Sequence, residues 1–71
     1  MDIGQAIQKM KADCRVARLG WNGKEMYIKI QNPDRNSMMT ESYVWMYTAQ
    51  KGRIPWLCSQ ADLLANDWIV V

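Results

Sequence analysis

The run from Tyr43 to Thr48, Tyr-Val-Trp-Met-Tyr-Thr, restricts the possible folds of this chain more than any other segment. Aromatic and β-branched residues favour strands, and successive side chains of a strand point to opposite faces of the sheet. Three rings therefore lie on one face, and Val44, Met46 and Thr48 lie on the other. If a helix covers the Val44 face, the ring face is either an exposed patch or is buried against a second copy of the chain.

Two upstream segments are predicted to form a hairpin. In residues 26–31 apolar side chains alternate with polar ones, which is typical of a half-buried antiparallel strand. Residues 14–19 also have strand character, and residues 20–25 connect the two segments.

The last third of the chain holds two more short strand candidates. Residues 53–54 precede Pro55, which cannot donate to a β-ladder, so this run is expected at a sheet edge. The turn before it is expected to place Gly52 in the left-handed region. Residues 67–71 are β-prone and are predicted to pair into the sheet.

Capping residues mark two helices. Asp2 and Gln5 are spaced as a capping box, and apolar residues repeat at helical spacing behind them, which predicts a helix over about residues 3–11. Ser59 opens a second, brief helix that ends at about Ala65.

Together these elements predict one α+β domain over residues 1–71. It comprises a small antiparallel sheet of about four to five strands, the N-terminal helix packed on one face, and the short helix before the last strand. A domain of this length buries only about 60% of its unfolded surface, so it needs a further stabiliser. With no His, and with Cys14 and Cys58 far apart, neither a Cys/His zinc site nor a Cys-x-x-C motif is available. One disulfide is formally possible, but we expect oligomerisation to be the stabiliser.

The composition excludes several classes of function. The chain shows no signal peptide and no apolar run near the roughly 20 residues of a membrane span, so we expect a soluble cytoplasmic protein. The formal net charge of +2 favours neither DNA nor a membrane as partner. Without His, an activated nucleophile or a nucleotide-binding glycine motif, catalysis is not expected. Binding remains, and four Trp and three Tyr suit ligand pockets and interfaces.

The turn Gly20-Trp21-Asn22-Gly23 is a candidate binding element with two interpretations. Its ring either stacks on a flat ligand or folds back over the sheet edge. Asp62, three residues after Ser59, also has two interpretations. Its carboxylate either satisfies amides of the short helix, which the spacing favours, or accepts hydrogen bonds from an adenine amino group or a ribose hydroxyl.

Residues 32–42 form a long polar loop that contains Met38 and Met39. We expect these two side chains to cover a pocket or a partner subunit, because apolar side chains in a polar loop otherwise face water. The alternative is a disordered loop.

Three blocks of sequence carry a resemblance to a known family. They are Asp2-Ile3-Gly4-Gln5-Ala6-Ile7, then Val16-Ala-Arg-Leu-Gly-Trp-Asn-Gly-Lys24, then Pro55-Trp-Leu-Cys-Ser-Gln-Ala-Asp-Leu-Leu-Ala-Asn-Asp-Trp68. Through them the whole chain resembles the small phage proteins of the Thoeris anti-defence two family. The resemblance implies a compact homo-oligomer, commonly a tetramer, that sequesters cyclic ADP-ribose-type signals made by bacterial TIR proteins without degrading them. Some members also hold cyclic oligonucleotides in a second type of pocket.

The resemblance also implies a set of ligand-binding residues. Trp21 would stack on the base, Asp62 would accept hydrogen bonds from base or ribose, and Arg18 is assigned to the pyrophosphate by its charge and proximity. The full expected set is Arg18, Gly20, Trp21, Asn22, Gly23, Trp56, Ser59, Gln60 and Asp62. No catalytic residue, metal ligand or cofactor is expected. The expected partners are a cyclic ADP-ribose isomer or cyclic oligonucleotide and further copies of the chain, as a dimer or tetramer, in the host bacterial cytoplasm.

An alternative function comes from the ring face itself. Tyr43, Trp45 and Tyr47 could serve as a stacking platform for RNA or single-stranded nucleic acid. The near-neutral charge speaks against this module, because such binders normally track the phosphate backbone with excess positive charge.

Overall fold

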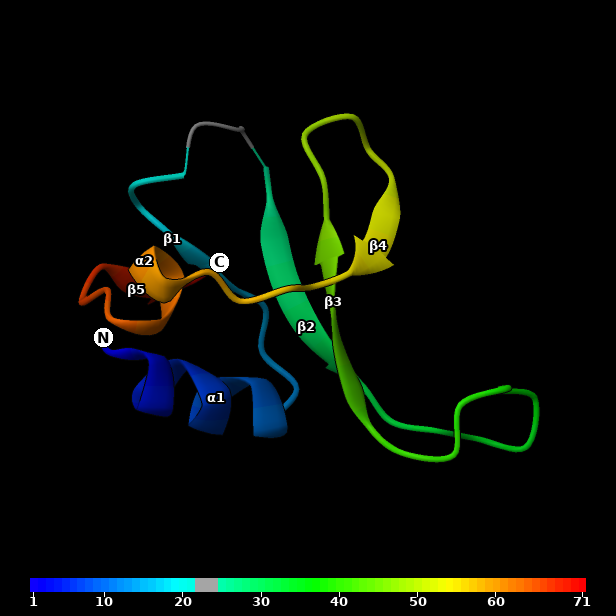
Figure 1. Cartoon of the computed structure of the whole chain (residues 1–71). Coiled ribbons are helices and arrows are strands. Elements are labelled where there is room, and N and C mark those ends of the chain that lie inside the picture. The colour runs from blue at the N-terminus through cyan, green and yellow to red at the C-terminus, as the bar shows by residue number, and fades with distance from the viewer. Residues whose placement is uncertain (22–24) are drawn as a thin grey trace.

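The computed structural model describes residues 1–21 and 25–71. In chain order their elements are α1 (Ile3–Lys11), β1 (Val16–Arg18), β2 (Tyr27–Gln31), β3 (Tyr43–Tyr47), β4 (Arg53–Pro55), α2 (Gln60–Leu63) and β5 (Trp68–Val70). The strands form one antiparallel sheet in the order β4-β3-β2-β1-β5 (Figure 1). This arrangement confirms the predicted α+β fold, including the short helix before the last strand.

Helix α1 has the bounds that its capping signals predict. The Gln5 amide donates to the Asp2 carboxylate at 2.8 Å, and the Asp2 amide donates to the Gln5 side chain at 3.0 Å. These two bonds satisfy amides that the first helical turn otherwise leaves unpaired. Ala6 and Met10 are buried against the sheet, so α1 covers one of its faces.

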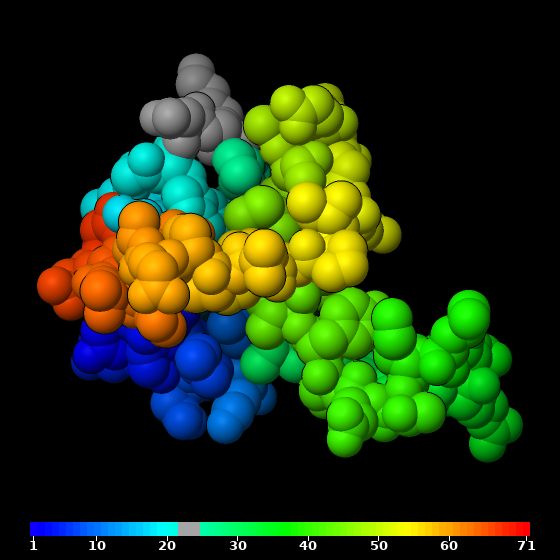
Figure 2. Space-filling model, viewed as in Figure 1, coloured from blue at the N-terminus to red at the C-terminus, as the bar shows by residue number. Residues whose placement is uncertain are grey.

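The same face carries the core of the domain. Val16, Ile28 and Trp68, from three neighbouring strands, are fully buried and pack with the apolar stripe of α1. The segment between β4 and α2 runs across β3 and β2 on this side (Figures 1 and 2). Its Trp56 amide donates to the Val44 carbonyl at 3.0 Å. Helix α1, this segment and α2 therefore cover one face of the sheet, which we call the covered face.

The other face, which we call the open face, carries the rings. Tyr27 lies opposite Tyr47 in the β2–β3 register, and Lys29 lies opposite Trp45, so these residues share a face away from the core. No helix of the described residues packs on it. The predicted separation of the two faces of β3 is therefore confirmed, and the rings stay half-buried in the single chain.

Some boundaries differ from the prediction. Strands β1 and β5 are shorter than the segments 14–19 and 67–71, although β5 pairs with β1 as expected for a terminal strand. In the β3–β4 turn the left-handed residue is Lys51, with φ of 65°, and not Gly52. The Thr48 carbonyl accepts the Lys51 amide and its hydroxyl accepts the Gly52 amide, so Thr48 sets the turn.

The β2–β3 connection extends from the body as an arm of residues 32–42 (Figure 1). Ser42 donates from its hydroxyl to the Asn32 side chain at 2.8 Å and closes the base of the arm. Met38 is 97% exposed, while Met39 borders a hollow on the open face beside Trp45. That Met38 and Met39 cover a pocket or a partner subunit stays a prediction.

Neither helix of the described residues is long and apolar enough to cross a bilayer.

Candidate functional site

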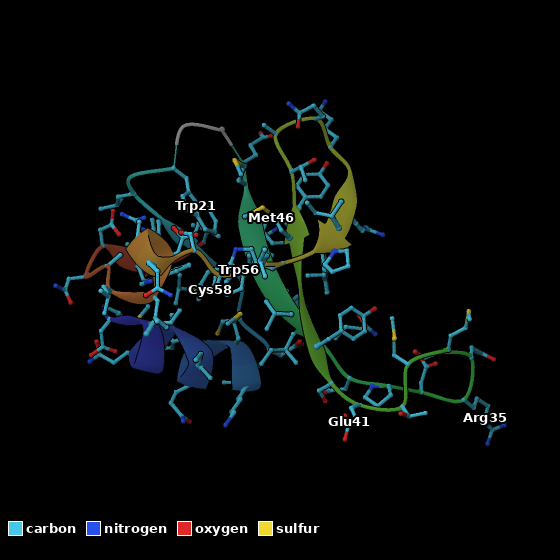
Figure 3. All side chains as sticks on the ribbon, in the orientation of Figure 1. Trp21, Arg35, Glu41, Met46, Trp56 and Cys58 are labelled. Atoms are coloured by element: carbon cyan, nitrogen blue, oxygen red, sulfur yellow. The ribbon has the colours of Figure 1, made fainter. Side chains whose placement is uncertain are left out.

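Three tryptophans from distant parts of the chain meet at the α2 end of the covered face. Trp68 on β5 is fully buried, and its ring contacts the rings of Trp21 and Trp56 edge to face. The centroid distances from Trp68 are 5.3 Å to Trp21 and 6.0 Å to Trp56. Figure 3 labels Trp21 and Trp56. Such perpendicular contacts favour aromatic pairs beyond their buried area. Trp68 therefore brings together Trp21 and Trp56, which come from two sequence blocks that were expected to supply binding residues.

Asp62 links two of these rings through hydrogen bonds. The Trp21 indole N–H donates to Asp62 Oδ1 at 3.1 Å, and the Trp68 indole N–H donates to the Asp62 carbonyl at 3.1 Å. The Asp62 amide is satisfied by the Ser59 hydroxyl, which caps α2. The Asp62 carboxylate accepts from the Trp21 indole and not from the amides of α2. This differs from the interpretation that the spacing of Ser59 and Asp62 favoured, in which the carboxylate satisfies helix amides.

Trp21 itself folds back over the end of the sheet. Its amide donates to the Arg18 carbonyl at 3.2 Å, and its half-buried ring packs against the core. The folded-back interpretation is thus correct for this ring. Ligand stacking is compatible with it, because part of the ring still faces solvent.

Arg18 lies between two carboxylates. Its Nε donates to Asp67 Oδ1 at 2.7 Å, and its Nη1 donates to Asp62 Oδ1 at 2.8 Å. Its Nη2 lies 3.4 Å from Asp67 Oδ2. The side chains of Arg18, Asp62 and Asp67 are 19%, 14% and 31% exposed, so water screens the group only in part. One cation with two anions leaves this cluster with a net charge of about −1.

The pKa values of the cluster follow from these bonds. Hydrogen bonds from Arg18 and from the Gly20 amide lower the pKa of Asp67 despite partial desolvation. For Asp62, desolvation raises the pKa, but bonds from Arg18, Trp21 and Ser59 together outweigh it and lower the pKa. The two carboxylates in turn raise the pKa of Arg18. All three groups are therefore charged at neutral pH.

Gly20 allows a close approach of Asp67 to the backbone. Its amide donates to Asp67 Oδ2 at 2.9 Å. A Cβ on residue 20 would lie 3.0 Å from that oxygen and 3.2 Å from Arg18 Nη2, closer than ordinary contacts allow. A glycine here thus permits a carboxylate to hold the backbone just before Trp21.

The remaining predicted residues lie around this cluster or outside the description. Ser59 is the exposed N-cap of α2 and Gln60 its exposed first residue. Asn22 and Gly23 lie outside the described residues.

The thiol of Cys58, which precedes Ser59, has a pKa raised by burial and by the Asp62 charge, so it is protonated at neutral pH. Within residues 1–21 and 25–71 no cluster of His, Cys, Asp and Glu is arranged to hold a metal ion.

Sequence reasoning did not assign two residues that organise the site, Asp67 and Trp68. Several of their contacts join positions 47 or more residues apart, such as Arg18 with Asp67, Gly20 with Asp67 and Trp21 with Trp68. No local periodicity reports such contacts. The signal that was available is the Asp-Trp pair after α2, which belongs to the third block of the resemblance.

The open face offers a different chemistry. Tyr27 and Tyr47 stack with centroids 5.2 Å apart, and the Arg15 guanidinium lies 4.6 Å from the Tyr27 centroid. The Arg53 guanidinium lies 5.5 Å from the Trp45 centroid. A shallow hollow of about 680 Å³ on this face is bordered by Arg15, Tyr27, Tyr47 and Arg53. It is a broad aromatic surface with cations at its margin.

Comparison with known proteins agrees with the family resemblance of the sequence. Residues 1–71 match the family model of the Thoeris anti-defense 2-like domain. Thoeris anti-defense 2 of Bacillus phage SP01 is 30% identical over 84 residues, which covers 100% of this chain and 94% of the relative. The aligned stretch is longer than this chain, so the relative contains additional residues within it. These matches show that the chain belongs to the Thoeris anti-defense 2-like family.

Proposed function

We propose that this chain counters Thoeris defence by binding a cyclic ADP-ribose-type or related cyclic nucleotide signal and holding it out of solution, without chemical change. Membership of the Thoeris anti-defense 2-like family supports the anti-defence role, acting in the host bacterial cytoplasm. The chemistry of the Trp21–Asp62 pair supports the class of ligand.

The proposal rests on one observation: the ionised Asp62 carboxylate and the Trp21 ring, from distant segments, are held side by side. Arg18 and Trp21 both donate to Asp62 Oδ1, and neither of them donates to Asp62 Oδ2. A nucleoside presents a flat ring together with amino and hydroxyl donors. The ring suits the exposed part of Trp21, and the donors suit Asp62 Oδ2.

The charge of the cluster constrains where the phosphates lie. Arg18 uses three of its N–H groups on Asp62 and Asp67, and a phosphate beside it meets two carboxylates as well as one guanidinium. Arg18 retains two donors that can reach a pyrophosphate, the role expected from its charge and proximity. In this proposal its larger part is to hold Asp62, and cations from elsewhere in the assembly supply most of the phosphate binding.

A second copy of the chain completes this proposal. A signal that works near micromolar levels demands a sequestering protein with nanomolar affinity, about −12 kcal/mol. The site on a single chain would leave part of a ligand in solvent, because Ser59 and Gln60 beside it are exposed. A pocket closed between subunits buries more of the ligand. The open face, with Trp45 and the stacked tyrosines half-exposed, is a second surface on which we expect copies to meet as a dimer or tetramer, in addition to the contact that closes the pocket.

Mass spectrometry of small molecules released from the protein tests the proposal. The purified protein is exposed to lysate from TIR-activated cells, washed and heated, and the supernatant is analysed. We expect an intact cyclic nucleotide at a fixed ratio to protein, and its loss in Asp62→Asn, with Asp13→Asn as the matched control on an exposed carboxylate. No bound nucleotide, or a hydrolysed one, would overturn the proposal.

The open face supports the second candidate, a nucleic-acid-binding module. Arg15 and Arg53 over rings are the combination that stacks bases beside a phosphate backbone. This candidate predicts affinity for single-stranded RNA that rises with strand length and falls steeply with salt. If the affinity measured by filter binding depends on neither strand length nor salt, this candidate is excluded in favour of sequestration.

A further inference from the structure

We infer that Asp67 is a positioning residue that keeps Arg18 away from Asp62 Oδ2, so that this oxygen can accept hydrogen bonds from a ligand. The inference rests on the proposed function only for the identity of the ligand. The positioning itself is a property of the cluster and can be measured without ligand.

Asp67 holds Arg18 from one side. Its Oδ1 accepts from Arg18 Nε at 2.7 Å, and its Oδ2 lies 3.4 Å from Arg18 Nη2. A guanidinium is planar and rigid, so two contacts on this edge determine where the third nitrogen points. Nη1 then reaches Asp62 with a single hydrogen bond, on Oδ1.

This restraint matters because an arginine prefers two parallel hydrogen bonds to a carboxylate. If Asp67 lost its charge, Arg18 would be left with Asp62 as its only anion in the cluster. Arg18 would then rotate into two-point contact with Asp62 and cover both carboxylate oxygens. The oxygen proposed for the ligand would become occupied, and the bond from Trp21 to Oδ1 would face a competitor.

Asp67 also holds the backbone that carries Trp21. Its Oδ2 accepts the Gly20 amide at 2.9 Å, and its carbonyl accepts the Leu19 amide at 3.1 Å. These bonds restrain the two residues just before Trp21. Both carboxylate oxygens of Asp67 are occupied within the chain, so Asp67 acts through Arg18 and Gly20 and does not itself contact ligand.

Two variants separate this role from a general contribution to folding. Asp67→Asn removes the charge and keeps the shape. Gly20→Ala keeps the charge but places a Cβ 3.0 Å from Asp67 Oδ2, which displaces the same carboxylate from the other side. Asp13→Asn is the control, because Asp13 pairs with Lys29 at 3.2 Å, remote from the cluster, and its side chain is 85% exposed.

The readouts are the indole N–H signals of Trp21 and Trp68 in NMR hydrogen exchange, and calorimetric titration with cyclic ADP-ribose. In Asp67→Asn and Gly20→Ala we expect Trp21 to exchange about tenfold faster, while Trp68, bonded to the Asp62 backbone, keeps its protection. Affinity for cyclic ADP-ribose should fall about tenfold in both variants and stay unchanged in Asp13→Asn.

The outcomes are distinct. Unchanged exchange of Trp21 in Asp67→Asn overturns the inference, and equal loss of protection at Trp21 and Trp68 overturns it in favour of a purely structural role. If the wild-type chain does not bind cyclic ADP-ribose, that ligand fails as the signal in the proposed function, and the exchange data still decide the positioning of Trp21 and Asp62.

Discussion

The covered and open faces of this sheet use arginine and aromatic rings in opposite ways. On the covered face, Arg18 is neutralised by two aspartates and the rings pack edge to face on Trp68. On the open face, Arg15 and Arg53 lie over rings as cations. The first arrangement suits a ligand that brings hydrogen-bond donors and a flat ring. The second suits a broad contact with another surface.

The contrast also concerns stability. Residues of the covered face belong to the core of the domain, whereas the rings of the open face remain half-exposed in the single chain. A small domain depends on few core residues. Substitutions on the covered face should therefore change folding and ligand capture, and those on the open face should change association.

The largest effect is expected for Trp68→Ala. Removing this fully buried ring leaves a cavity under Trp21 and Trp56 and should lower the free energy of unfolding by about 3–5 kcal/mol. Urea denaturation followed by circular dichroism measures the change. A loss of less than about 1 kcal/mol would show that the tryptophan cluster is not part of the core.

Trp21→Ala should have the next largest effect. The variant loses one edge contact and one hydrogen bond to Asp62, so unfolding should become easier by about 2 kcal/mol. Ligand capture should be abolished while light scattering reports the same oligomer as the wild-type chain. Dissociation of the oligomer would instead show that Trp21 is needed to hold the subunits together.

Acidification should weaken the covered face. Because the pKa values of Asp62 and Asp67 are lowered below their ordinary value of 3.8, their contribution to stability is complete above about pH 5. It is lost as the pH falls through 3.8 toward the lower folded-state pKa values. Asp62→Asn should reduce this acid dependence in thermal melts, while Asp13→Asn should retain it. An unchanged slope in Asp62→Asn would contradict the ion-pair account.

The smallest effect on folding is expected on the open face. Trp45→Ala should change the free energy of unfolding of the single chain by less than about 1 kcal/mol, because its ring is half-exposed. It should shift the oligomer toward smaller species in light scattering. A stable oligomer with an unchanged mass would show that copies meet elsewhere.

The sequence predicted those parts of the fold that depend on local signals. The capping box of α1 and the alternation in β2 and β3 involve residues within a few positions of each other, and the structure confirms them. Local reasoning placed the left-handed residue at Gly52, whereas hydrogen bonds to Thr48 put Lys51 there.

The sequence proposed candidate residues for the site but not their geometry. The three blocks identified Trp21 and Asp62, and the structure joins them at 3.1 Å. The pairing of Arg18 with Asp67 spans 49 positions and leaves no trace in spacing or composition. The expected pyrophosphate role of Arg18 was therefore assigned without knowledge of its two carboxylate partners.

Fluorine NMR of the chain labelled with 5-fluorotryptophan tests the division between the faces most directly. The four tryptophans report separately on the covered face, through Trp21, Trp56 and Trp68, and on the open face, through Trp45. On titration with cyclic ADP-ribose, the account predicts that the Trp21 and Trp56 signals shift while the Trp45 signal stays in place. A shift of Trp45 with Trp21 unmoved would contradict it.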